Sequence, residues 1–158
     1  DPIHDVIISG NQDTGTTYQP APGAKKWVSL TTADGGDVAV APVTRSPGTS
    51  ARFSSFQFLD TFIRTTWTGP GAPDSFTVID TGFIPDTQFV TPIAINAVDP
   101  TRMVVGGEFA TYESVIGVDV TIDSLGPGSF GPVRGSGGVN RNAMAFGESQ
   151  KGTFCFSE

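Results

Sequence analysis

Three aspartates near the start of the chain belong to a residue type that does acid–base chemistry or binds cations. Asp13 stands in "NQDTG", and Asp34 and Asp37 stand in "ADGGD". Two carboxyl groups about 5–10 Å apart can hydrolyse a glycosidic bond, one of them being kept protonated. Carboxylates and carbonyls in turns can also bind Ca²⁺, although neither stretch matches the Asp-x-Asp-x-Asp-Gly calcium loop. Asp and Gly are equally the residues of tight turns, and this is the interpretation that the pattern favours.

The chain holds other residues suited to chemistry, but no motif joins them. A glycosidase pair could draw on further carboxylates, and the sequence does not say which converge: Asp60, Asp80, Asp86, Asp99 and Glu108. His4 is the single histidine, and no Gly-x-Ser-x-Gly stretch marks a nucleophilic serine. One histidine and one cysteine, Cys155, do not make a zinc site. We therefore lean against an enzyme, assign no catalytic or metal-binding residue, and keep calcium as the one cofactor that these turns would suit.

The acidic composition argues against two classes of partner. The formal net charge is −7, with three lysines and six scattered arginines. Nucleic acid and anionic membrane both require clustered cations. No apolar run approaches the ~20 residues of a membrane-spanning helix. The expected partner is therefore a protein or a glycan.

The elements that position these residues are predicted to be short strands, which makes the chain all-β. It is rich in Gly, Pro, Thr, Ser, Val and Phe, which favours strands joined by tight turns. Residues 53–67 predict two strands with a break at Leu59-Asp60 rather than one helix. The predicted strands are residues 5–9, 16–19, 26–31, 37–41, 51–58, 62–68, 76–79, 92–97, 103–107, 111–115, 120–122, 142–146 and 153–156.

An internal repeat indicates how these strands are grouped. "DPIHDVIISGNQDTGTTYQP" and "DPTRMVVGGEFATYESV" share an order of features, and the aligned positions Tyr18, Ile63 and Tyr112 are 45 and then 49 residues apart. A strand of small and apolar residues recurs at 36–42, 91–97 and 139–147. Four strands in about 45–50 residues is the size of a propeller blade. We predict a partial β-propeller of four-stranded blades, with a partial blade at 1–36, blades at 37–90 and 91–135, and the start of another at 136–158. A β-sandwich is the alternative.

Two phrases of the sequence carry a family likeness over roughly residues 1–125. The first is a Gly-x-Gln-Asp-x-Gly-Thr turn, a Trp strand and an Asp-Gly-Gly turn; the second runs from Asp-Pro through Val-Gly-Gly to Tyr-x-Ser. The residues are Gly10, Gln12, Asp13, Gly15, Thr16, Trp27, Asp34, Gly35 and Gly36, then Asp99, Pro100, Val105, Gly106, Gly107, Tyr112 and Ser114. These phrases resemble the Asp-box (BNR-type) propellers, which include sortilin-type receptors and xyloglucan-hydrolysing glycosidases. The chain departs from that group after Ser114, where the Ser-x-Asp-x-Gly-x-Thr-Trp box is absent, so no catalytic residue is carried over.

The combined expectation is a non-catalytic binding or structural module of a larger or oligomeric exported protein, secreted or at the cell surface. Unpaired strand edges of a partial propeller predict a homo-oligomer or a longer chain. The candidate ligand-binding residues are Asp13, Asp34, Asp37, Trp27 and Trp67, the tryptophans because they stack on sugar rings, although at strand positions they are more often core. The alternatives are a fragment of a glycoside hydrolase of the Asp-box group, and a β-sandwich adhesin or coat domain.

Overall fold

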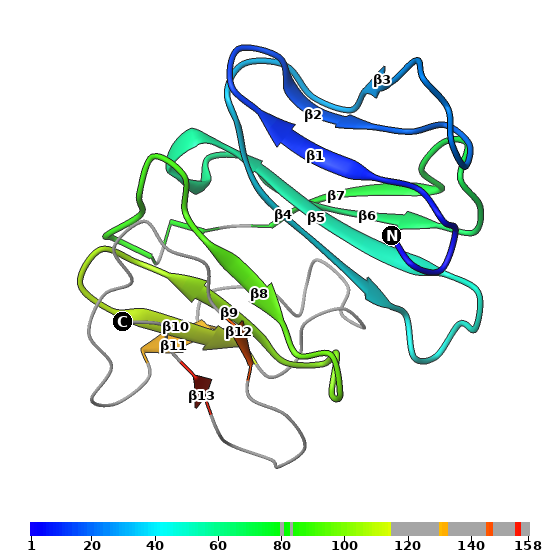
Figure 1. Cartoon of the computed structure of the whole chain (residues 1–158). Helices are drawn as coiled ribbons and strands as arrows, with labels where there is room; N and C mark the ends of the chain where they lie inside the picture. The colour runs from blue at the N-terminus through cyan, green and yellow to red at the C-terminus, as the bar shows by residue number, and fades with distance from the viewer. Residues whose placement is uncertain (80, 83, 115–129, 133–144, 147–153, 156–158) are drawn as a thin grey trace.

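The computed structural model describes residues 1–79, 81–82, 84–114, 130–132, 145–146 and 154–155, and this part of the chain is all-β (Figure 1). It contains thirteen strands and one short 3₁₀ segment, η1. Their bounds are β1 Ile8–Asn11, β2 Gly15–Tyr18, β3 Val28–Ser29, β4 Gly35–Pro42, β5 Ser50–Phe56, η1 Gln57–Leu59, β6 Phe62–Trp67, β7 Ser75–Ile79, β8 Ile93–Ile95, β9 Met103–Gly106, β10 Thr111–Ser114, β11 Phe130–Pro132, β12 Ala145–Phe146 and β13 Phe154–Cys155.

The strands form open antiparallel sheets in which sequence neighbours are also spatial neighbours. The orders are β1-β2-β3, β4-β5-β6-β7, β8-β9-β10-β11 and the hairpin β12-β13. Two four-stranded sheets thus follow one another, with β4 beside β8 and β8 beside β12. Strand β1 lies beside β4, so the first sheet covers one side of the second (Figure 1).

The prediction for residues 53–67 is confirmed, because β5 and β6 flank the 3₁₀ segment η1 rather than forming a helix. Strand β5 ends at Phe56, two residues earlier than predicted. The predicted strand at 120–122 lies outside the described residues. Strand β11 was missed, because its Phe-Gly-Pro sequence reads as a turn: Gly and Pro weaken strand interiors. Among the described residues, no helical segment has the length and apolar character of a membrane span.

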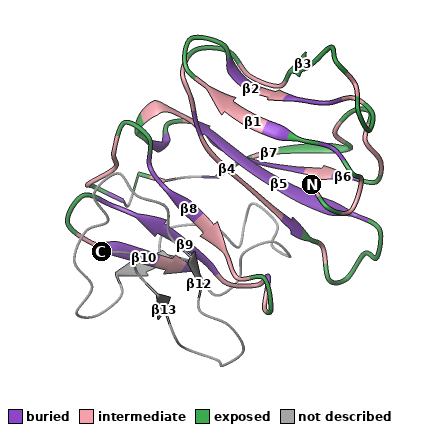
Figure 2. Ribbon diagram, viewed as in Figure 1, coloured by how far each residue is buried: buried purple, intermediate pink, exposed green. Residues whose placement is uncertain are grey.

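The middle sheet, β4 to β7, packs against a neighbour on each face. Alternation on β5 sends Phe53 towards the β8–β10 side and Arg52 towards the β1–β2 side. The larger core contains Phe53, Phe62 and residues of β8, β9 and β10. The smaller core contains Ile8, Tyr18 and Trp67. Both faces of the central strands are therefore buried, as the purple colour along β5 shows (Figure 2).

Candidate functional site

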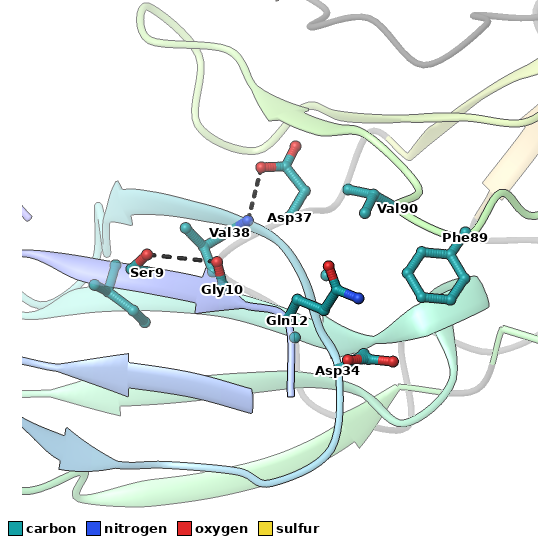
Figure 3. Close-up of a pocket in the computed structure, with 11 residues that line it drawn as sticks. Ser9, Gly10, Gln12, Asp34, Asp37, Val38, Phe89 and Val90 are labelled. Atoms are coloured by element: carbon teal, nitrogen blue, oxygen red, sulfur yellow. Dashed lines mark hydrogen bonds between the residues drawn. The ribbon is translucent and has the colours of Figure 1, made fainter. Parts of the chain in front are cut away.

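A polar pocket of about 350 Å³ opens where β1, the start of β4 and the segment before β8 meet (Figure 3). Asp34, Asp37, Gln12 and Ser9 contribute polar side chains, and Phe89 and Val90 contribute apolar ones. Its remaining lining comes from the strands beneath: Ile8, Gly10, Gly35, Gly36 and Val38. Two of the five predicted ligand-binding residues therefore line one pocket.

Asp34 joins two hairpin turns. Its Oδ1 accepts the backbone N–H of Asp13 at 2.7 Å, and its backbone carbonyl accepts the N–H of Gln57 at 3.0 Å. Asp13 lies in the β1–β2 turn with φ 64°, a left-handed conformation that Asp tolerates better than most residues. The turn interpretation of Asp13 is thus confirmed, and Asp13 stands at the rim beside Asp34 rather than among the residues that line the pocket.

Asp37 links two sheets. Its Oδ1 accepts the N–H of Val38 at 2.8 Å, and its Oδ2 accepts the N–H of Ile93 in β8 at 3.0 Å. The residue sits inside β4, at the register shift between Gly35 and Val38, whereas the sequence predicted that this strand opens at Asp37. The shift turns the carboxylate towards the neighbouring sheet, because a bulge re-aims side chains.

Glycines allow the close approach of β1 to β4 beneath the pocket. A Cβ built on Gly10 would overlap the carbonyl oxygen of Gly36, and one built on Gly35 would lie 2.7 Å from the carbonyl oxygen of Gly15. Any side chain at Gly10 would therefore push the two strands apart. Backbone of β1 and β4 therefore meets closely beside the pocket.

The two tryptophans lie away from this pocket. Trp67 is completely buried; Arg52 lies over its ring at 3.8 Å, the ring of Tyr18 meets it edge-on at 4.7 Å, and its Nε1–H donates to Thr65 Oγ1. Trp27 is 40% exposed and directly precedes β3, at the far end of β2 from the β1–β2 turn. The structure therefore places Trp67 in the smaller core and Trp27 on a separate surface.

Around the pocket, backbone hydrogen bonds gather one end of every large sheet into a single surface. Besides the contacts of Asp34, the N–H of Phe58 donates to the carbonyl of Phe89 at 3.0 Å, and the N–H of Glu108 donates to the carbonyl of Asp86 at 2.7 Å. We call this surface the turn end: it comprises residues 12–14, 34–37, 57–61, 86–90 and 107–110. Because antiparallel strands alternate in direction, the β2–β3, β4–β5, β6–β7 and β8–β9 connections lie at the opposite end.

Three phenylalanines are exposed at the turn end, and sequence reasoning missed them. Phe58, Phe89 and Phe109 are 54%, 46% and 73% exposed, and the rings of Phe58 and Phe89 meet edge to face at 5.4 Å. Each stands in a segment between two strands of the structure. For Phe89 and Phe109 the available signal was a bulky apolar residue between predicted strands, because turn residues are normally small or polar. Phe58 gave no such signal, because it ends the predicted strand 51–58.

The β5–β6 turn shows how one of these rings becomes exposed. Phe58 and Leu59 both have left-handed backbone, with φ 58° and 56°, which costs roughly 1–2 kcal/mol per non-glycine residue. Leu59 is fully buried in the larger core, while Phe58 next to it is turned outward. Burial of Leu59 offsets the backbone strain, and exposure of Phe58 is the consequence.

Asp86 organises the turn that carries Phe109. Its Oδ2 accepts the N–H groups of Phe109 and Ala110 at 2.8 and 2.9 Å, and its Oδ1 accepts the hydroxyl of Tyr112 at 2.6 Å. Burial alone would raise the pKa of Asp86, but these hydrogen bonds outweigh it and hold the pKa below its ordinary value. Burial and the same carboxylate raise the pKa of Tyr112 to about 12. A Cβ on Gly107 would lie 2.5 Å from Asp86 Oδ1, so this contact requires glycine.

A second cluster of polar residues, at the opposite end, has the residue types of a catalytic triad but not its geometry. Both the carboxylate of Asp1 and Ser50 Oγ face Nδ1 of His4, at 3.0 and 3.3 Å, while Nε2 faces the carbonyl of Gly48. A triad needs serine and aspartate on opposite ring nitrogens. Arg52 instead pairs with Asp1 at 2.8 Å, and burial lowers the pKa of Arg52 to about 10, so it stays cationic at neutral pH. The cluster is a buried ion pair that holds residues 1–6 on β5.

No cluster of three or more histidine, cysteine or acidic side chains suited to a metal ion occurs in the described part of the chain. Calcium therefore stays a prediction from the turns. The Gly-rich residues 134–142 lie outside the described residues. Comparison with models of known protein families, with curated proteins and with solved structures finds no match.

Proposed function

We propose that the chain is a non-catalytic binding module with partial β-propeller architecture, belonging to a larger or oligomeric exported protein. Two consecutive four-stranded meanders support the architecture. So does the line of first strands, in which β4 lies beside β8 and β8 beside β12, as inner strands do around a propeller axis. Strands β3 and β7 end their sheets, so further copies or further chain would cover these edges.

The observation that carries the binding role is the exposure of Phe58, Phe89 and Phe109 at the turn end, where Phe89 also lines the pocket and Phe58 contacts Phe89. Each ring buries roughly 150–250 Å² when it is covered, so about half-exposed rings leave on the order of 350 Å² of aromatic surface in water. The largest apolar patch on a typical monomeric protein is about 300–600 Å² and is often functional. The turn end therefore binds the ligand, which we expect to be a protein or a glycan.

The glycoside hydrolase alternative rests on one observation, which is that Asp34 and Asp37 line the same pocket. Both carboxylate oxygens of Asp37 and Oδ1 of Asp34 already accept backbone N–H groups. A carboxyl group in that position acts as a structural acceptor, whereas a glycosidase needs one carboxylic acid that donates its proton. We therefore favour binding over hydrolysis.

Two measurements test the proposal. Incubation with xyloglucan and other β-glucans should release no reducing ends; hydrolysis that is lost in Asp13→Asn and Asp34→Asn would establish the enzyme instead. The immobilised chain should retain ligands from a panel of oligosaccharides and peptides, and Phe109→Ala should lose them. Phe76→Ala is the matched control, because Phe76 is also exposed, at 53%, but lies on β7. Equal loss in both variants, or retention in both, would contradict a site at the turn end.

A further inference from the structure

Charge is distributed unequally between the two ends of the sheets. The turn end contains the carboxylates of Asp13, Asp34, Asp37, Asp60, Asp86 and Glu108. Every lysine and arginine among the described residues lies elsewhere. Lys25, Lys26, Arg45 and Arg102 stand in connections at the opposite end, and Arg52 and Arg64 are buried within the middle sheet. The segments of the turn end therefore carry six acidic residues together with the exposed phenylalanines, and no lysine or arginine of the described part of the chain stands among them.

Two exposed acids of the turn end lie close in sequence to exposed phenylalanines. Glu108 is exposed on the same turn as Phe109, and Asp60 is exposed two residues after Phe58. Asp60 accepts only the N–H and hydroxyl of its neighbour Thr61. Their charge consequently faces solvent beside the aromatic rings, where it can attract an approaching cation.

The aromatic rings are arranged for a cation and an alkyl chain rather than for a flat sugar face. Phe58 and Phe89 are 83° apart in ring plane, so they do not form one continuous platform. Phenylalanine also lacks the polar group with which tyrosine or tryptophan bonds a hydroxyl-rich ligand. A guanidinium or ammonium over a ring face is attracted by the ring electrons, and this chain already contains such a contact between Arg52 and Trp67.

We infer that the turn end binds a basic, partly apolar polypeptide segment of a partner protein. This inference rests on the proposed binding function and specifies its ligand. Arginine or lysine side chains of the segment meet the carboxylates of Asp34, Asp60 and Glu108, and its apolar side chains and lysine or arginine stems cover the three phenylalanines. Phosphate-bearing ligands are repelled by the same carboxylates.

The experiment titrates the fluorescently labelled chain with a short peptide of alternating arginine and leucine, and with two comparison probes. These are a peptide of alternating glutamate and leucine and a neutral oligomer of β-1,4-linked glucose. We expect the basic peptide alone to bind. Its affinity should fall as salt rises from about 50 to 200 mM, because part of the attraction is between exposed charges.

Four variants locate the binding. Phe109→Ala should weaken the basic peptide about tenfold, as truncation of an interface aromatic does. Asp60→Asn with Glu108→Gln should weaken it roughly threefold to tenfold and flatten the salt dependence. Asp5→Asn removes an exposed acid at the opposite end, and Phe76→Ala removes an exposed ring elsewhere. Both control variants should bind within about twofold of the unaltered chain, and an unchanged urea midpoint confirms that each variant folds.

Each other outcome has a definite meaning. Absence of binding by the basic peptide overturns the inference, and so does binding that the turn-end variants leave unchanged. Binding of the glucose oligomer that Phe109→Ala abolishes also overturns it, but leaves the proposed binding function standing. Hydrolysis of that oligomer would instead remove the proposed function itself.

Discussion

Removal of the Asp86 carboxylate provides a quantitative test of how the β9–β10 turn is held. Asp86→Ala deletes the acceptor of three hydrogen bonds, from the N–H groups of Phe109 and Ala110 and from the hydroxyl of Tyr112. Tyr112→Phe deletes only the last. A hydrogen bond to a charged group contributes about 1.5–3 kcal/mol. We therefore expect Tyr112→Phe to lower the free energy of unfolding by about 1.5 kcal/mol.

Asp86→Ala should lower the free energy of unfolding by about 3 kcal/mol, rather than by three times the ~1.5 kcal/mol expected for Tyr112→Phe. Phe109 is 73% exposed, so its N–H finds water once the carboxylate has gone, whereas the Tyr112 side chain is buried and does not. The double variant should be no less stable than Asp86→Ala alone, because the shared bond is lost only once. The resulting coupling energy is about 1.5 kcal/mol, which is typical of directly contacting residues.

Urea denaturation of the four proteins measures these differences, provided that the slope with denaturant stays constant. Additive effects of the two substitutions would refute a direct bond between Asp86 and Tyr112. The pH dependence gives a second check. Because the pKa of Asp86 is lowered in the folded chain, its contribution is present above the unfolded value of about 3.9 and is lost as pH falls below it. The stability gap between the unaltered chain and Asp86→Ala should therefore narrow in acid.

Three further predictions concern other parts of the chain. Gly10→Ala should lower the free energy of unfolding by about 3 kcal/mol, because its Cβ meets backbone of β4, whereas Gly71→Ala, in open space, should leave the urea midpoint nearly unchanged or slightly raised. Arg52→Met should cost about 3 kcal/mol in the same assay at neutral pH, since it leaves a buried carboxylate without its cation. Spectroscopic titration of Tyr112 in a variant without the other tyrosine should give a pKa of about 12. The stability that this shift contributes is present below about pH 10 and is lost as pH rises towards 12. A titration of Tyr112 near pH 10 in the folded chain would contradict its hydrogen bond to the Asp86 carboxylate.

Local patterns were sufficient to predict most of the strands. The break between β5 and β6 followed from alternating apolar residues, and the turn at Asp13 followed from the preference of Asp and Gly for left-handed backbone. Asp34 could be proposed for a ligand surface because a turn carboxylate next to glycines is normally accessible. These features depend on residues within a few positions of one another.

The aromatic surface could not be predicted, because it depends on contacts distant in sequence. Phe58 is exposed because the neighbouring Leu59 fills the core between two sheets, and Phe89 meets it only after the chain has passed through β6 and β7. Arg52 shows the reverse case. Its charge predicts an exposed side chain, but the structure buries it completely against Trp67. Periodicity assigns a face to each of these residues but not the sheet that will cover it.

The bond between Asp37 and Ile93 has a consequence for how the chain unfolds. In proteins built from successive similar units, stability is approximately the sum of unit and interface contributions, and weakly joined units unfold one by one. One carboxylate here fastens the first strand of the middle sheet to the first strand of the next, 56 positions away. This link adds to the interface contribution and favours unfolding of both sheets in one transition. The backbone N–H groups of Val38 and Ile93, which donate to the Asp37 carboxylate, should therefore exchange their hydrogens only when both sheets open together.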